Sequence, residues 1–306
     1  MDINLRSPGI VTSLIILSIE VFAAIFTYAF ITYGILCDFH KKKHLPPAKK
    51  IQCAVHLSSI CFTIVSYANL LCEVLWPDLC KTLYSEGVFI SLTVYSVSSC
   101  AWFTALVSFF YFTKIADVRS GFLGWTKKMI NYFAHYLIVV IHVLCLVISF
   151  LNMLLLRFLQ DPSTNSSVIP PASSTFGTKA ANLRVAKFTL AMISVPFLTM
   201  IINVLLTGQF LKLHEHTMGK NMAKSGDDTL KIYQNIVSQM IHFLFLYAAF
   251  YLVFFLFYFS SFSQQSPGYW VTMILMLSFT PIQFVMIIIH YPNVNKNWKE
   301  LLQYFI

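Results

Sequence analysis

The stretch FFYFTKIADVRSGFLGWTKK, residues 109–128, places four consecutive aromatic residues at the end of a long apolar run. Lys114 follows them, and Lys127 and Lys128 close the stretch. A cation at the C-terminal end of a helix complements the helix dipole, and its long side chain can reach lipid headgroups. The pattern therefore predicts an apolar helix that ends at a cationic surface.

The composition of the whole chain supports a membrane protein. Of its 306 residues, 58% are hydrophobic and only 11% are charged. A water-soluble domain of this size needs more charge to cover its surface. The net charge of +9 lies in short clusters between apolar runs rather than on one soluble face, so it does not indicate a nucleic-acid partner.

Seven apolar runs are each long enough to cross about 30 Å of hydrocarbon as helices. Strand-like alternation is absent, and lipid requires internally satisfied backbone groups, so helices are expected. We predict a single all-α domain over residues 1–306, a seven-helix transmembrane bundle. The predicted helices cover 9–37, 51–75, 89–112, 130–156, 186–211, 232–262 and 269–290. The tail, 294–305, is predicted to form a short amphipathic helix along the inner leaflet.

The connecting segments predict the orientation of the bundle. Those after the first, third and fifth runs, together with the tail, carry 15 of the 21 lysines and arginines, against 6 on the opposite side. Because cytoplasmic loops are enriched in Lys and Arg, we expect an extracellular N-terminus and a cytoplasmic C-terminus. Asn165, the first residue of the chain's Asn-Ser-Ser sequon, then falls in the longest outer loop and is a predicted glycosylation site.

The chain shows no signature of enzymatic chemistry. Its seven cysteines have no CxxC or metal-ligand spacing, and most lie within apolar runs. Cys72 and Cys80 lie near the outer end of the second run, where a local disulfide is the alternative to two buried thiols. There is no HExxH, Gly-rich phosphate loop or nucleophile elbow. We expect no enzyme activity, no cofactor and no metal.

Three segments carry a family resemblance. WFTALVSFFYFTKIA, from Trp102 to Ala116, resembles helix 3 of the bitter taste receptors (type 2 taste receptors), where a Tyr follows the Trp by nine residues and precedes Leu-Lys-Ile-Ala. Here Thr113 replaces the leucine. The fifth run is similar to the family's helix 5 through Pro196 and Phe197. The exit of helix 5 and the entry of helix 6 match through Leu211, His214, Met218, Asp227, Lys231, Ile241, Phe243, Leu244, Leu246, Tyr247 and Ala248.

Several positions depart from the family's pattern. Tyr28 and Ser59 stand where the family usually has an Asn in helix 1 and an Arg in helix 2. Gln283 and Phe284 replace a usual His-Ser, and Phe250 replaces a frequent Tyr. A buried Arg without its polar partner is costly in lipid. We therefore interpret the loss of both partners as one altered contact between helices 1 and 2, in a divergent member of the family.

The resemblance implies a G-protein-coupled bitter taste receptor of the plasma membrane. It implies that small, largely apolar bitter compounds bind in the outer half of the bundle, and that a gustducin or Gi-type heterotrimeric G protein is activated. The implied ligand-binding residues are Trp102, Asn69, Leu106, Phe250 and Met273. The residues implied in G-protein coupling are Tyr111, Lys114, Ile115, His214, Lys220 and Lys231.

Other interpretations stay open at this point. The aromatic residues of the predicted site could serve only helix packing. A vomeronasal-type pheromone receptor is the alternative within receptors, although such receptors normally keep outer-loop cysteines that this chain lacks. A small-solute transporter is the alternative outside receptors. It would require charged residues converging at mid-membrane and paired interrupted helices, and neither is found in the sequence.

Overall fold

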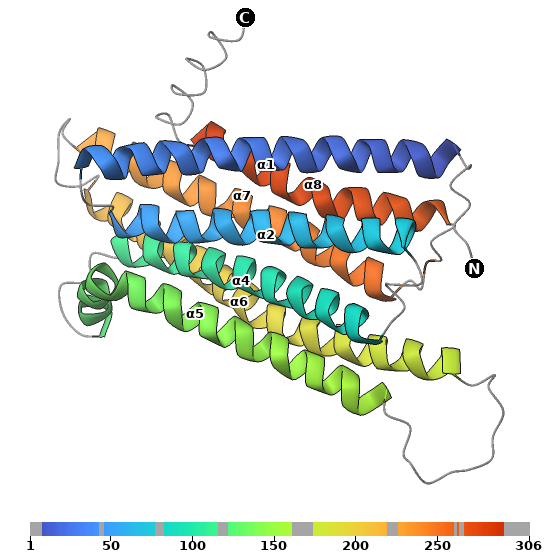
Figure 1. Ribbon diagram of the computed structural model, residues 1–306. Helices are drawn as coiled ribbons and strands as arrows, with labels where there is room; N and C mark the ends of the chain where they lie inside the picture. The colour runs from blue at the N-terminus through green and yellow to red at the C-terminus, as the bar shows by residue number, and fades with distance from the viewer. Residues whose placement is uncertain are drawn as a thin grey trace, which may run out of the picture.

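The computed structural model describes residues 8–42, 46–76, 83–115, 122–160, 174–218, 226–259, 262 and 266–290. In this part of the chain every regular element is a helix. The helices are α1 (Pro8–Lys42), α2 (Pro47–Leu75), α4 (Leu83–Ile115), α5 (Phe122–Gln160), α6 (Ser174–Met218), α7 (Gly226–Phe259) and α8 (Pro267–His290). They lie side by side in one bundle (Figure 1). The predicted all-α, seven-helix fold is confirmed.

The helix bounds differ from the predicted ranges mainly by extension. The largest difference is at α6, which begins at Ser174 rather than at 186 and ends at Met218 rather than at 211. Hydropathy marks only the apolar stretch of a spanning helix, whereas backbone hydrogen bonding continues into its polar ends. The predicted interfacial helix at 294–305 lies outside the described residues.

Six of the described helices contain a stretch long and apolar enough to cross a membrane. The seventh, α8, has no Asp, Glu, Lys or Arg among its 24 residues. At about 1.5 Å per residue it reaches about 36 Å, which exceeds a hydrocarbon core of about 30 Å. By length and composition, all seven helices are therefore suited to spanning a bilayer.

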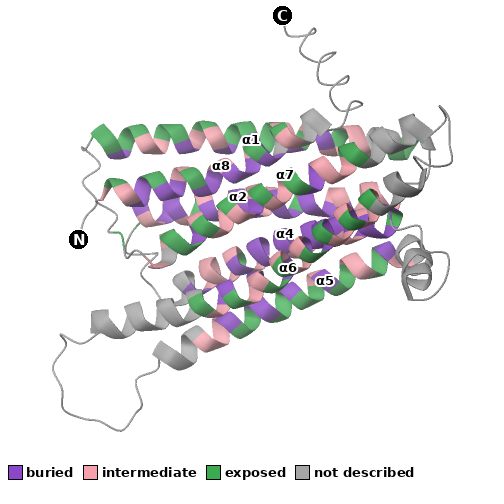
Figure 2. Cartoon of the chain, turned by 180° about the vertical axis from the view of Figure 1, so that it is seen from behind, coloured by how far each residue is buried: buried purple, intermediate pink, exposed green. Residues whose placement is uncertain are grey.

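The outward faces of the helices are apolar. On α5 the side chains of Tyr136, Val140, Val143, Val147 and Phe150 are each between 50% and 60% exposed, and they recur every three or four residues. Figure 2 shows such exposed residues along the outside of α1 and α5. An apolar stripe this long facing water would oppose folding. Facing lipid it meets no such penalty, so the exposure pattern fits a multi-pass membrane protein.

Helix α4 occupies the centre of the bundle. It packs against α2, α5 and α6, and over a shorter stretch against α7, while α1 packs against α2 and α8. Small buried side chains line α4 at Ser96, Ser98, Ser99, Ala101 and Ala105. Small residues let helices approach closely in lipid, where van der Waals packing rather than the hydrophobic effect holds helices together. The residues of α4 therefore contact several helices at once.

A polar contact also connects α1 and α8, although most contacts between the helices are apolar. Ser278 Oγ on α8 donates a hydrogen bond of 2.8 Å to Glu20 Oε1 on α1.

Cys72, at the end of α2, is disulfide-bonded, and its partner lies outside the described residues. The disulfide alternative considered for this end of α2 therefore applies to Cys72. Four other cysteines of the described residues are free thiols: Cys53, Cys61, Cys100 and Cys145.

Candidate functional site

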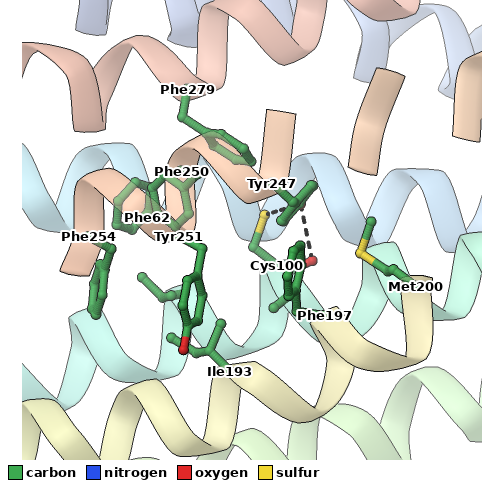
Figure 3. A pocket seen from close by; sticks show the side chains of 12 residues that line it. Phe62, Cys100, Ile193, Phe197, Met200, Tyr247, Phe250, Tyr251, Phe254 and Phe279 are labelled. Carbon is green, nitrogen blue, oxygen red and sulfur yellow. Dashed lines mark hydrogen bonds between the residues drawn. The ribbon is translucent and has the colours of Figure 1, made fainter. Parts of the chain in front are cut away.

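A cavity of about 500 Å³, its opening included, lies where α2, α4, α6, α7 and α8 meet. Cys100, Met200 and Tyr247 place it near the midpoints of the α4, α6 and α7 spans. From there it extends past Ile193 and Phe254 toward the end of the bundle where α1 begins, which we call the N-terminal end. Its twelve lining residues are drawn in Figure 3: Phe62, Val97, Cys100, Ala101, Ile193, Phe197, Met200, Tyr247, Phe250, Tyr251, Phe254 and Phe279.

Aromatic rings form most of the cavity wall. Phe250 is central, with its ring centroid 4.5 Å from that of Phe279 and 5.6 Å from that of Phe62, the latter edge-on at 88°. Across the cavity, Phe197 stacks on Tyr251 at 5.6 Å with an interplanar angle of 9°. Aromatic walls suit flat or compact apolar ligands.

The cavity contains no charged lining residue, and its polar atoms bond to protein groups. The Tyr247 hydroxyl contacts the Cys100 thiol at 3.2 Å and the Thr104 hydroxyl. The Tyr251 hydroxyl contacts Ser194 Oγ at 2.9 Å. A ligand here would therefore gain mostly from apolar contact and shape rather than from ion pairing.

A buried polar junction adjoins the cavity. The Tyr28 hydroxyl on α1 donates a 3.1 Å hydrogen bond to Gln283 Oε1 on α8, and Ser59 Oγ on α2 lies 3.1 Å from the same oxygen. Ser59 Oγ also lies 3.2 Å from the Cys100 thiol. All three side chains of the junction are at most 1% exposed. The altered contact predicted between helices 1 and 2 is thus made through a third helix, α8.

A second cavity lies nearer the opposite end of the bundle, where α1, α4 and α6 end; we call this the lysine-bearing end. Its empty space is about 370 Å³, its opening included, and it is lined by Gln52, Val55, His56, Thr104, Val107, Gln239, Phe243 and Gln283. A neighbouring space of about 240 Å³ between α4, α6 and α7 includes Tyr111. Nδ1 of the buried His56 has no hydrogen-bond partner among the described residues. Polar side chains at this depth in a membrane commonly mark functional sites.

The structure brings only one of the five predicted ligand-binding residues to the aromatic cavity. Phe250 lines it, and Met273 packs in the apolar cluster that includes Phe254. Trp102 and Leu106 pack instead in the cluster between α2, α4 and α5. Asn69 Nδ2 donates to Glu73 Oε1 at 3.2 Å in the last turns of α2, nearer the N-terminal end of the bundle. These residues therefore belong to several sites rather than to one.

The predicted coupling residues that the structure describes lie at the lysine-bearing end. The Tyr111 hydroxyl accepts a hydrogen bond from Gln52 Nε2 at 3.0 Å. Lys114 is exposed, with Nζ 5.6 Å from the centroid of the Phe110 ring, and Ile115 is buried. The side chains of His214 and Lys231, and residues Lys220 and Asn165, lie outside the described residues.

Sequence reasoning missed most of the aromatic wall, although a signal for it was present. Tyr247, Phe250, Tyr251 and Phe254 are spaced i, i+3, i+4 and i+7 on α7. That spacing places all four on one face of a helix. Every run in this chain is apolar, however, so the spacing alone cannot separate a cavity face from a lipid face.

A seven-helix membrane bundle with a small-molecule cavity near mid-depth is typical of G-protein-coupled receptors. A family model described as Taste receptor protein (TAS2R) matches residues 7–305. The chain therefore belongs to the taste receptor family, a family of seven-transmembrane G-protein-coupled receptors, and is not an enzyme. This match sets aside the vomeronasal-type and transporter alternatives.

Individual relatives carry the same name at modest identity. Taste receptor type 2 member 109 of Rattus norvegicus is 26% identical over 239 residues, which cover 77% of this chain and 73% of that protein. Taste receptor type 2 member 39 of Macaca mulatta is 23% identical over 305 residues, 96% of this chain and 88% of that protein. Taste receptor type 2 member 13 of Pan troglodytes is 30% identical over 156 residues, 49% of each chain.

Proposed function

We propose that this receptor binds small, largely apolar bitter compounds in the aromatic cavity between α4, α6 and α7. The observation that carries the proposal is a cavity of about 500 Å³ with an uncharged, mainly aromatic wall. Phe250 is the central contact in this proposal, and Met273 supports the wall from the adjoining cluster. Trp102, Leu106 and Asn69 remain candidates on the family resemblance alone.

We further propose that the lysine-bearing end faces the cytoplasm and engages a gustducin or Gi-type heterotrimeric G protein. Tyr111, Lys114 and Ile115 would contact it from α4, with His214, Lys220 and Lys231 contributing from α6, α7 and their connection. A ligand that binds the active arrangement more tightly than the inactive one shifts the population toward it. Pro196, beside Phe197 in α6, and Pro281 in α8 lie inside their helices and are suitable hinges.

A panel of bitter compounds tests this function directly. The receptor would be expressed with a chimeric Gα that links Gi-type receptors to calcium release, and calcium would be recorded. We expect concentration-dependent signals from apolar members of the panel, and none in cells that carry the Gα alone. Ligand-dependent nucleotide exchange on Gα should accompany these signals. Uptake of the compound without nucleotide exchange would contradict the receptor proposal.

An accessibility experiment tests the orientation and the plasma-membrane location together. An epitope tag inserted beside Asn165 should bind antibody on intact cells, because that loop is expected outside. A tag at the C-terminus should bind only after permeabilisation. Digestion with an N-glycosidase should also increase the mobility of the wild-type chain but not that of Asn165→Gln. A tag at Asn165 that is reached only in permeabilised cells would contradict the proposed orientation.

A further inference from the structure

Two tyrosines are the only hydroxyl-bearing residues among the twelve that line the aromatic cavity. Tyr247 and Tyr251 both come from α7, and their hydroxyls are directed at different neighbouring helices. The Tyr247 hydroxyl reaches Thr104 on α4, and the Tyr251 hydroxyl reaches Ser194 on α6. Neither Thr104 nor Ser194 is a lining residue of this cavity. Tyr251 therefore turns its polar atom toward a residue behind the wall, whereas Tyr247 contacts both Thr104 behind the wall and Cys100 in it.

The direction of each hydrogen bond follows from counting protons. Ser194 Oγ lies 2.7 Å from the carbonyl oxygen of Leu190, to which its single proton is donated. Ser194 can then only accept from Tyr251, whose hydroxyl is the donor. Thr104 Oγ1 likewise donates to the carbonyl oxygen of Cys100 at 2.8 Å and accepts from Tyr247, whose hydroxyl also lies 3.2 Å from the Cys100 thiol and 3.4 Å from the Cys100 carbonyl oxygen. Each tyrosine proton is thus directed away from the ligand space.

We propose that Ser194 and Thr104 determine ligand specificity without touching the ligand, by accepting the only two hydroxyl protons of the cavity wall. This inference rests on the proposed ligand-binding role of the cavity. With both protons taken, the wall offers no hydroxyl donor to a ligand carbonyl or ether. A ligand that brings such an acceptor into the cavity loses its bonds to water without replacement, so the site discriminates in favour of apolar compounds.

Removing one acceptor should reverse this preference. In Ser194→Ala the hydroxyl proton of the half-buried Tyr251 has no partner behind the wall, and a donor in an apolar wall without a partner is unfavourable. A ligand carbonyl that accepts this proton then gains a hydrogen bond that the wild-type receptor does not offer. One such bond corresponds to about a tenfold gain in affinity. Thr104→Val should have a smaller effect, because the Tyr247 hydroxyl keeps the thiol and the carbonyl oxygen of Cys100 as partners.

Limonene and carvone suit the measurement because they share a carbon skeleton and differ by a ketone. Each would be titrated into purified full-length receptor in phosphatidylcholine nanodiscs, and affinity obtained from the concentration-dependent rise in melting temperature. Partition of each terpene into lipid is the same for every variant, so it cancels when affinity ratios are compared. We expect the preference for limonene over carvone to fall about tenfold in Ser194→Ala and by less in Thr104→Val.

The matched control is Ser194→Thr, which keeps a hydroxyl acceptor and should keep the wild-type ratio. A purely structural role for Ser194 would instead weaken both terpenes by the same factor, and that result would overturn the inference. An unchanged ratio in Ser194→Ala, with limonene still bound, would also overturn it and leave the proposed ligand cavity standing. Wild-type receptor that binds neither terpene would contradict the ligand cavity itself, and this inference with it.

Discussion

Replacing Ser59 with arginine should almost abolish folded receptor at the cell surface. Ser59 is 0% exposed, and its Oγ lies within 3.2 Å of both Gln283 and Cys100. Among the residues described around it there is no carboxylate to pair with a guanidinium. An unpaired cation at mid-membrane costs about 3 kcal/mol or more, a large fraction of the stability of a typical domain. Antibody staining of intact cells, normalised to total receptor, measures the loss.

The controls for this substitution are Ser59→Ala and a variant that carries the family's usual residues at positions 28, 59 and 283. Ser59→Ala removes the hydroxyl without adding charge and should retain most of the surface receptor, because only one hydrogen bond of the junction to Gln283 is lost. The triple variant Ser59→Arg, Tyr28→Asn, Gln283→His supplies small and polar neighbours and should recover part of the signal lost in Ser59→Arg. Equal surface levels for wild type and Ser59→Arg would show that the junction tolerates a charge, contrary to our account.

The bundle itself was predictable because lipid leaves few choices. Apolar runs of spanning length must be helical to satisfy their backbone groups, so hydropathy located all seven helices. Helix ends were predicted less well, since α6 continues well beyond its apolar stretch at both ends. Lys114 also indicated the end of α4 correctly, because its side chain is exposed and α4 ends one residue later, at Ile115.

The site was less predictable than the fold, for a physical reason. In a soluble protein, polarity separates the buried face of a helix from the exposed face, but both faces are apolar here. Trp102 was therefore favoured over Phe250 as a ligand contact on the family resemblance, whereas the structure packs Trp102 against α2 and α5 and places Phe250 in the cavity wall. The junction at Gln283 was visible only as a departure from the family pattern, because its three members come from α1, α2 and α8.

Truncating Phe250 should produce the largest loss of agonist response among the residues of the cavity. Its ring contacts Phe62, Phe254 and Phe279, so it forms the wall shared by α2, α7 and α8. Burying a phenylalanine-sized apolar group is worth about 1.5–3 kcal/mol, so Phe250→Ala should raise the concentration of agonist needed for half-maximal calcium release by about 10–100-fold. Surface staining of the same cells separates this effect from loss of folded receptor.

Two further variants show where the ligand contacts lie. Phe250→Tyr restores the residue that the family often carries and keeps the aromatic ring, so the potency of an apolar agonist should stay within about threefold of wild type. Trp102→Ala tests the placement implied by the family resemblance. If the ligand occupies the aromatic cavity, Trp102→Ala should lower the amount of surface receptor but leave agonist potency close to wild type. The reverse pattern, with potency lost in Trp102→Ala and kept in Phe250→Ala, would move the ligand to the packing between α2, α4 and α5.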